Sequence, residues 1–155
     1  MEFRSGIGFI KDYISRTKKN YIQLKNGPYE VTALINSMVG FLILPKEALN
    51  KKITDTLIQK STLLELQKRI CMNTYFNSMH NDNLYQICRH MRNAVAHNNI
   101  TFQSVNNVAA GSIAQIHSIT FKNEDGAQKF EMTLEVNLLE KFLLEFADGI
   151  LKKIH

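Results

Sequence analysis

Thirteen consecutive residues, 87–99 (ICRHMRNAVAHNN), hold two arginines, two histidines and three asparagines among side chains typical of a helix core. Arg92 is followed directly by Asn93, and His97 comes four residues after Asn93. Arginine can stabilise a phosphate oxyanion, and histidine can move a proton near neutral pH. These residue types suit cleavage of RNA, in which the 2′-hydroxyl attacks the adjacent phosphate and the 5′-oxygen leaves. We therefore regard Arg92, Asn93 and His97 as candidate catalytic residues.

The other polar side chains of this stretch are candidates for binding rather than for chemistry. We expect Arg89, His90 and Asn98 to contact RNA, because each can donate hydrogen bonds to a phosphate or a base. The formal net charge of +5 suits a polyanionic partner, although many proteins without such a partner share it. Charge therefore agrees with an RNA ligand without identifying one.

Other chemistries fit the stretch less well. The nearest acid is Asp82, so carboxylate clusters of the kind that hold two catalytic metals are not expected. His80, Cys88, His90 and His97 lack the spacing of a zinc site, and Cys88 with His90 lacks the orienting acid of a thiol protease. We predict neither a metal nor a cofactor. An arginine and a histidine at this spacing on one helix also occur as ordinary surface residues.

On a regular helix, one chain cannot easily direct both Arg92 and His97 at the same phosphate. On a helix over 83–97 the apolar arc consists of Leu84, Ile87, Cys88, Met91, Ala94 and Val95. Asn93 and His97 then lie on one edge of this arc, and Arg92 lies on the other edge, about 140° from His97. Either the helix distorts near its end, or two copies of the helix meet so that each cleft receives residues from both chains.

Composition bounds the class of protein. The chain has 155 residues, of which 45% are hydrophobic and 21% charged, so we expect one soluble globular domain over 1–155. The N-terminus lacks the apolar core of a signal peptide, and the apolar run 38–44 is too short to span a membrane. We expect a cytoplasmic protein, in which Cys71 and Cys88 are reduced and buried.

Hydrophobic spacing predicts a mainly α-helical bundle with a small antiparallel β segment, at about 100–136, before the C-terminal helix. We expect Asp82 to cap the helix over 83–96, and Asn137 with Glu140 to begin the last helix. The helix over 29–44 is apolar nearly all round, so it is central in the bundle or meets a second subunit. The predicted helices are 3–24, 29–44, 62–72, 83–96 and one after 137, and the predicted strands are 100–102, 113–122 and 130–136.

The segment Arg92-Asn93-Ala94-Val95-Ala96-His97 resembles the R-N-x-x-x-H signature of the HEPN family (higher eukaryotes and prokaryotes nucleotide-binding). A second segment, 29–47, resembles the front of a compact, plasmid- and defence-associated branch of that family, where it likewise precedes an arginine–histidine helix and a C-terminal β segment. The two matches and their order cover about residues 29–102.

The resemblance implies a helical bundle, a homodimer that pairs the motif helices, and metal-independent endoribonuclease activity typical of toxins and phage-defence effectors. It places Arg92 and His97 as catalytic and Asn93 as supporting, and it suggests an antitoxin or another regulatory protein as a partner. Some HEPN toxins carry a modified tyrosine three residues after the histidine, where this chain has Ile100. Other members keep the fold without cleaving RNA, so an inactive module that binds RNA or a protein is the alternative.

Overall fold

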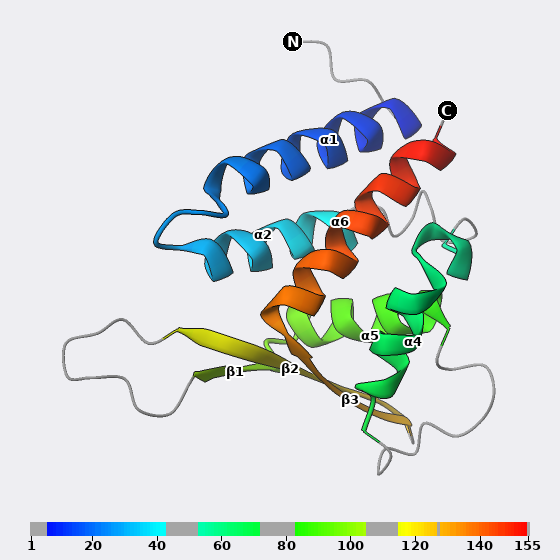
Figure 1. Ribbon diagram of the computed structural model, residues 1–155. Coiled ribbons are helices and arrows are strands. Elements are labelled where there is room, and N and C mark those ends of the chain that lie inside the picture. The colour runs from blue at the N-terminus through cyan, green and yellow to red at the C-terminus, as the bar shows by residue number, and fades with distance from the viewer. Residues whose placement is uncertain (1–5, 43–52, 72–82, 105–114, 127, 155) are drawn as a thin grey trace.

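The computed structural model describes residues 6–42, 53–71, 83–104, 115–126 and 128–154 (Figure 1). Its elements are α1 (Ile7–Leu24), α2 (Glu30–Leu42), the 3₁₀ helix η1 (Asp55–Leu57), α4 (Lys60–Lys68), α5 (Leu84–Ala96), β1 (Ile100–Ser104), β2 (Ile116–Asp125), β3 (Gln128–Glu135) and α6 (Val136–Lys153). The predicted fold class is confirmed, because a mainly helical chain carries a three-stranded antiparallel sheet directly before its C-terminal helix.

The helices α1 and α2 form an antiparallel pair, and α6 crosses both of them (Figure 1). The two helices of the pair approach closely at Gly40, where an added Cβ atom would lie 3.1 Å from the Tyr13 ring and 3.2 Å from the Thr17 methyl group. Because α2 also packs against α5, it is central in the bundle, as its apolar sequence predicts. Its buried side chains include Leu34, Met38, Phe41 and Leu42.

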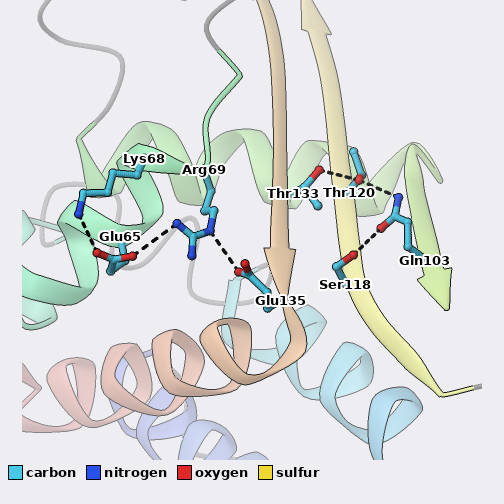
Figure 2. A network of polar contacts seen from close by, with 8 residues as sticks. All are labelled: Glu65, Lys68, Arg69, Gln103, Ser118, Thr120, Thr133 and Glu135. Carbon is cyan, nitrogen blue, oxygen red and sulfur yellow. Dashed lines mark hydrogen bonds and ion pairs between the residues drawn. The ribbon is translucent and has the colours of Figure 1, made fainter. Parts of the chain in front are cut away.

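The sheet has the strand order β1-β2-β3, with one face on the helices and the other polar. Alternate residues point inward, and the buried ones are Ile119, Phe121, Phe130, Met132 and Leu134. On the polar face, the Gln103 amide donates to Thr120 over 2.9 Å and accepts from Ser118 over 3.1 Å (Figure 2). The hydroxyls of Thr120 and Thr133 are 2.8 Å apart, so one chain of hydrogen bonds crosses all three strands (Figure 2).

The hairpin between β2 and β3 is tighter than the sequence suggests. The predicted strands 113–122 and 130–136 leave seven residues between them, but the pairing continues as far as Asp125 opposite Gln128. Gly126 follows with φ of 61°, a left-handed conformation that suits a short hairpin turn and that glycine adopts at little cost. The longer pairing extends β2 far enough for Asn123 to face α5.

The predicted helix over 62–72 is displaced toward the N-terminus, because the chain after α4 pairs with the sheet. Ile70 bridges Met132 of β3, and the Cys71 amide donates to the Glu131 carbonyl oxygen over 2.8 Å. Backbone groups used in this pairing cannot continue a helix. Cys71 is consequently exposed at the sheet edge, so our prediction that both cysteines are buried is wrong for Cys71.

Side-chain contacts hold the end of α4 against the sheet. The Arg69 guanidinium binds Glu135 at 3.1 Å and Glu65 at 3.4 Å, and Lys68 binds Glu65 at 2.9 Å (Figure 2). These bonds lower the pKa of the Glu65 carboxyl, chiefly through Lys68. The ion pairs therefore link α4 to the junction between β3 and α6.

The helix α6 begins directly where β3 ends. Glu135, rather than Asn137, is the residue at its N-cap, and no side-chain capping bond is formed there. The predicted capping box is therefore wrong, because Glu135 is still paired with Ser118 and the chain turns into the helix without a linker. Farther along α6, a Cβ atom on Gly149 would lie 2.1 Å from the Leu57 carbonyl oxygen, so only glycine allows η1 to pack this closely.

No helix among the described residues combines the length and the apolar character needed to cross a membrane.

Candidate functional site

The helix α5 carries four of the residues singled out from the sequence, and its C-terminal turn carries the other two. It packs with one side on β2 and another on α2, and lies behind the sheet in Figure 1. The predicted apolar arc is confirmed, with Val95 half-buried and the other members buried. The side chains turned away from the core are Tyr85, Gln86, Arg89, Arg92 and Asn93, all of them half-buried.

The N-terminus of α5 is fixed by two side-chain acceptors. The Asn83 side chain accepts a 2.9 Å hydrogen bond from the Gln86 amide, and Asp55 accepts one of 2.8 Å from the Leu84 amide. The first turn of a helix has amides without helical partners, and both bonds satisfy such amides. Asn83 is therefore the N-cap in place of the predicted Asp82, which lies outside the described residues.

The C-terminus of α5 is a Schellman turn, in which two amides after the helix donate back to its last turn. Asn98 donates to the Val95 carbonyl oxygen over 3.1 Å, and Asn99 donates to that of Ala94 over 2.7 Å. Asn98 has φ of 56°, and asparagine is one of the few residues besides glycine that adopt this conformation readily. His97 is consequently held at the C-cap position, directly before the turn.

His97 combines a fixed backbone with an exposed imidazole. Its amide donates to the Asn93 carbonyl oxygen over 3.0 Å, and its side chain is exposed. The turn that follows is tied to the sheet, because the Lys122 amide of β2 donates to the Asn99 carbonyl oxygen over 3.0 Å. A ligand on the surface can therefore reach the ring of His97.

Arg92 lies in the C-terminal half of α5, which ends at Ala96. Burial lowers the pKa of its guanidinium below the usual value, the phenol of Tyr85 acts in the opposite direction, and the charge of Arg89 lowers the pKa further. An arginine remains protonated despite such shifts. Tyr85, Cys88 and Arg89, the groups whose charge states affect this pKa, all precede Arg92 on α5.

Within one chain, the structure brings Asn93 and His97 together but not Arg92 and His97. The helix is regular as far as Ala96, and no hydrogen bond joins the side chains of Arg92, Asn93 and His97 in the described part of the chain. The alternative of a distorted helix end therefore finds no support. Arg92 also forms no ion pair with a carboxylate of the described residues.

The two arginines differ in how they are held. The Nη1 atom of Arg89 donates to the Gln86 side-chain oxygen at 3.3 Å, one helical turn earlier. Both guanidiniums are half-buried on the same side of α5, and Asn98 is exposed at its end. Arg89 and Asn98 are thus accessible for the RNA contacts expected of them.

His90 is placed in the core instead of on the surface expected for an RNA contact. Its side chain has no exposed area and stacks on the Phe130 ring, with centroids 4.8 Å apart and planes 9° apart. Its Nδ1 atom lies 2.8 Å from the Asn123 amide nitrogen, which can only donate, so Nδ1 accepts and the ring is neutral. The sheet covers this part of α5, and His90 is therefore a structural residue.

Cys88 is unsuited to act as a nucleophile. Burial raises the pKa of its thiol far above the usual range, although the charge of Arg92 acts in the opposite direction. The thiol is therefore protonated, and its position is about 200° around the helix from His90. The described residues contain no group of three or more histidine, cysteine or acidic side chains arranged to hold a metal.

Sequence analysis missed two residues of this region. Tyr85 is close enough to Arg92 to influence its pKa, and the spacing of seven residues on one helix face could have indicated this. Asn123 binds His90 across 33 residues of sequence, and no local pattern indicates such a pairing.

Comparison with known proteins bears on the family of the chain. No curated protein and no solved structure matches the chain. A family model described as HEPN pEK499 p136 matches residues 2–155, which is essentially the whole chain. That match includes α5 with its arginine and histidine, the sheet and the C-terminal helix. The chain therefore belongs to the HEPN pEK499 p136 family.

Proposed function

We propose that the protein is a metal-independent endoribonuclease of the HEPN type. The observation that carries the proposal is the arrangement of α5, which presents a half-buried arginine without a described carboxylate partner and ends at an exposed histidine. Membership of a HEPN family agrees with it. Arg92 and His97 are the catalytic residues, Asn93 supports them, and Arg89 and Asn98 contact RNA.

In the proposed reaction, the 2′-oxygen of RNA bonds to the adjacent phosphorus while the bond from phosphorus to the 5′-oxygen breaks. The 2′-hydroxyl loses its proton to a base and the 5′-oxygen gains one, so the products carry a 2′,3′-cyclic phosphate and a 5′-hydroxyl. His97 moves one of these protons. Arg92 stabilises the negative charge that develops on the phosphate oxygens, which a fixed cation does best in a partly desolvated place.

The proposed cleft lies between two copies of the chain. Because Arg92 and His97 lie about 140° apart around a regular α5, one chain does not present both to one phosphate. Two α5 helices packed in opposite directions would bring the arginine of one chain toward the histidine of the other. Such a cleft would contain both copies of His97, one to accept a proton and one to donate it.

Cleavage is tested by incubating purified protein with RNA in EDTA and analysing the ends of the fragments. We expect 2′,3′-cyclic phosphate ends for the wild type and no cleavage for Arg92→Ala or His97→Ala. Arg16→Ala and His117→Ala are matched controls, because both residues are exposed on other elements. Cleavage that survives loss of Arg92 or His97 would contradict the proposed site, and a solution mass of one chain would contradict the shared cleft.

The second candidate is a HEPN module that binds RNA or a protein partner without cleaving RNA. The separation of Arg92 from His97 within one chain favours it if the protein is monomeric. A wild-type protein that binds RNA tightly and cleaves none would support this second candidate.

The biological setting we propose is that of a cytoplasmic toxin or phage-defence effector, restrained by an antitoxin or another regulatory protein. Toxicity predicts that the wild type expresses poorly and that His97→Ala restores expression. Equal expression of both proteins would count against this role.

A further inference from the structure

One face of α5 carries an aromatic residue, Tyr85, and two arginines, Arg89 and Arg92. We propose that Tyr85 is the base-stacking residue of a subsite for single-stranded RNA, in which Arg89 and Arg92 bind the adjoining phosphate. This inference rests on the proposed function for the identity of the ligand as RNA. It adds to the proposed site an aromatic residue that stacks on a base.

Spacing along α5 places the three side chains on one face. Tyr85 and Arg89 are four residues apart, and Arg89 and Arg92 are three apart, so each pair occupies neighbouring turns of the same side. All three side chains are half-buried, which leaves one edge of each accessible. The Cα atoms of Tyr85 and Arg92 are about 10 Å apart along the helix axis, a distance that two long side chains on one face can span, and helical side chains lean toward the N-terminus, where Tyr85 lies.

The charges at this face favour an anion between the arginines. Two like charges three residues apart on a helix repel each other. Arg92 has no carboxylate partner among the described residues, and Arg89 donates a hydrogen bond to the uncharged side chain of Gln86. A phosphate would offset the repulsion and accept hydrogen bonds from both guanidiniums.

The ring of Tyr85 is suited to a base rather than to a second phosphate. It is an uncharged aromatic surface on the same face of α5 as both arginines. A base is attached one sugar away from its phosphate, so a phosphate held by the arginines brings a base to the ring. Aromatic side chains stack on bases that are free of pairing, whereas a duplex covers both faces of its bases. The subsite therefore selects single-stranded RNA.

The inference is tested on the full chain in a His97→Ala background, which blocks cleavage. A short fluorescent single-stranded RNA and the corresponding duplex are titrated, and fluorescence anisotropy gives Kd. We expect Tyr85→Ala to raise Kd for the single strand about tenfold, as removal of one stacked base does elsewhere, and to leave Kd for the duplex unchanged. Tyr85→Phe keeps the ring and should bind as the parent does.

Controls separate stacking from a change of fold. Tyr29→Ala removes a tyrosine that is 76% exposed before α2, and it should have no effect. Thermal unfolding reports whether Tyr85→Ala folds, and an RNA with abasic sites should bind Tyr85→Ala and Tyr85→Phe equally. Unchanged affinity of Tyr85→Ala for the intact single strand would overturn the inference, as would equal losses for single strand and duplex.

The inference and the proposed function fail in different ways. Tyr85-dependent binding by a protein whose wild type cleaves no RNA would remove the proposed reaction and keep the subsite. Cleavage by the wild type, together with normal binding by Tyr85→Ala, would remove the subsite and keep the reaction.

Discussion

His90 and His97 are two histidines on one helix with opposite surroundings. They are seven residues apart, so at about 100° per residue they lie on nearly the same side of α5. His90 is covered by Asn123 of β2 and Phe130 of β3, and it is fully buried. His97 lies where the helix ends and the chain turns toward β1, and it is exposed.

The difference shows that the position of each histidine relative to the sheet determines whether its ring is buried or accessible. A neutral imidazole that is stacked and hydrogen-bonded inside the protein can fix the position of its helix, but it cannot contact a ligand. An exposed imidazole on a fixed backbone can exchange protons with one. Histidine thus holds the helix in place from the core at position 90, and at position 97 it can exchange a proton with a ligand.

The largest expected effect is on cleavage by His97→Gln. Glutamine keeps a polar side chain but cannot exchange a proton, so we expect the initial rate of RNA cleavage to fall by about 10²–10⁴-fold. The exposed position predicts an unchanged midpoint of thermal unfolding. A variant that keeps the wild-type rate would show that His97 moves no proton in the reaction.

His90→Phe should lower stability and leave cleavage unchanged, which is the reverse of the result expected for His97→Gln. Phenylalanine keeps the stacking on Phe130 but leaves the buried Asn123 amide without its acceptor, so the free energy of unfolding should fall by about 1–3 kcal/mol. Cleavage per folded molecule should be retained. Urea unfolding measures the first quantity, and the initial rate below the transition measures the second.

The double variant His90→Phe/Asn123→Leu tests whether the loss comes from the hydrogen bond. Replacing both polar partners removes the unsatisfied amide, so the double variant should be more stable than His90→Phe alone. A further loss of stability would show that Asn123 contributes through packing that leucine cannot replace.

Sequence patterns predicted the parts of this comparison that depend on local spacing. The apolar arc of α5, the end of the helix near His97 and the period of β3 all follow from side chains within a few residues of one another. The position of the N-cap was wrong by one residue, because Asp82 and Asn83 are both good capping residues and only the contacts distinguish them.

What the sequence could not predict depends on contacts between distant segments. The burial of His90 requires Asn123 and Phe130, which belong to strands much later in the chain. The early end of α4 likewise follows from the pairing of Ile70 with Met132.

Asn98 tests how His97 is held at the end of α5. Asn98→Val places a β-branched residue at φ of 56°, which should lower the free energy of unfolding by about 1–2 kcal/mol and shift His97. Asn98→Gly accepts the conformation and should keep stability. It loses only the side chain that contacts RNA, so it should cleave faster than Asn98→Val. Urea unfolding and cleavage rates of the two variants measure these effects, and equal behaviour of valine and glycine would argue against the turn as the positioning device.

Cys88 and Cys71 extend the comparison of buried and exposed residues to a second pair. Burial raises the pKa of the Cys88 thiol in the folded protein, whereas an unfolded thiol ionises near pH 8.5. The folded state therefore binds this proton more tightly, and its contribution to stability is complete below pH 8.5 and is lost as pH rises toward the folded pKa. By pH 9 the loss should reach about 1 kcal/mol.

The measurement compares urea unfolding at pH 7 and pH 9 for the wild type, Cys88→Ala and Cys71→Ala. Cys88→Ala loses packing at both pH values, so only the difference between them bears on ionisation. This difference should shrink in Cys88→Ala and stay as in the wild type in Cys71→Ala, because Cys71 is exposed. If the difference in stability between pH 7 and pH 9 is unchanged in Cys88→Ala, the Cys88 thiol is accessible to solvent in the native state. The buried face of α5 would then be more open to solvent than the burial of His90 indicates.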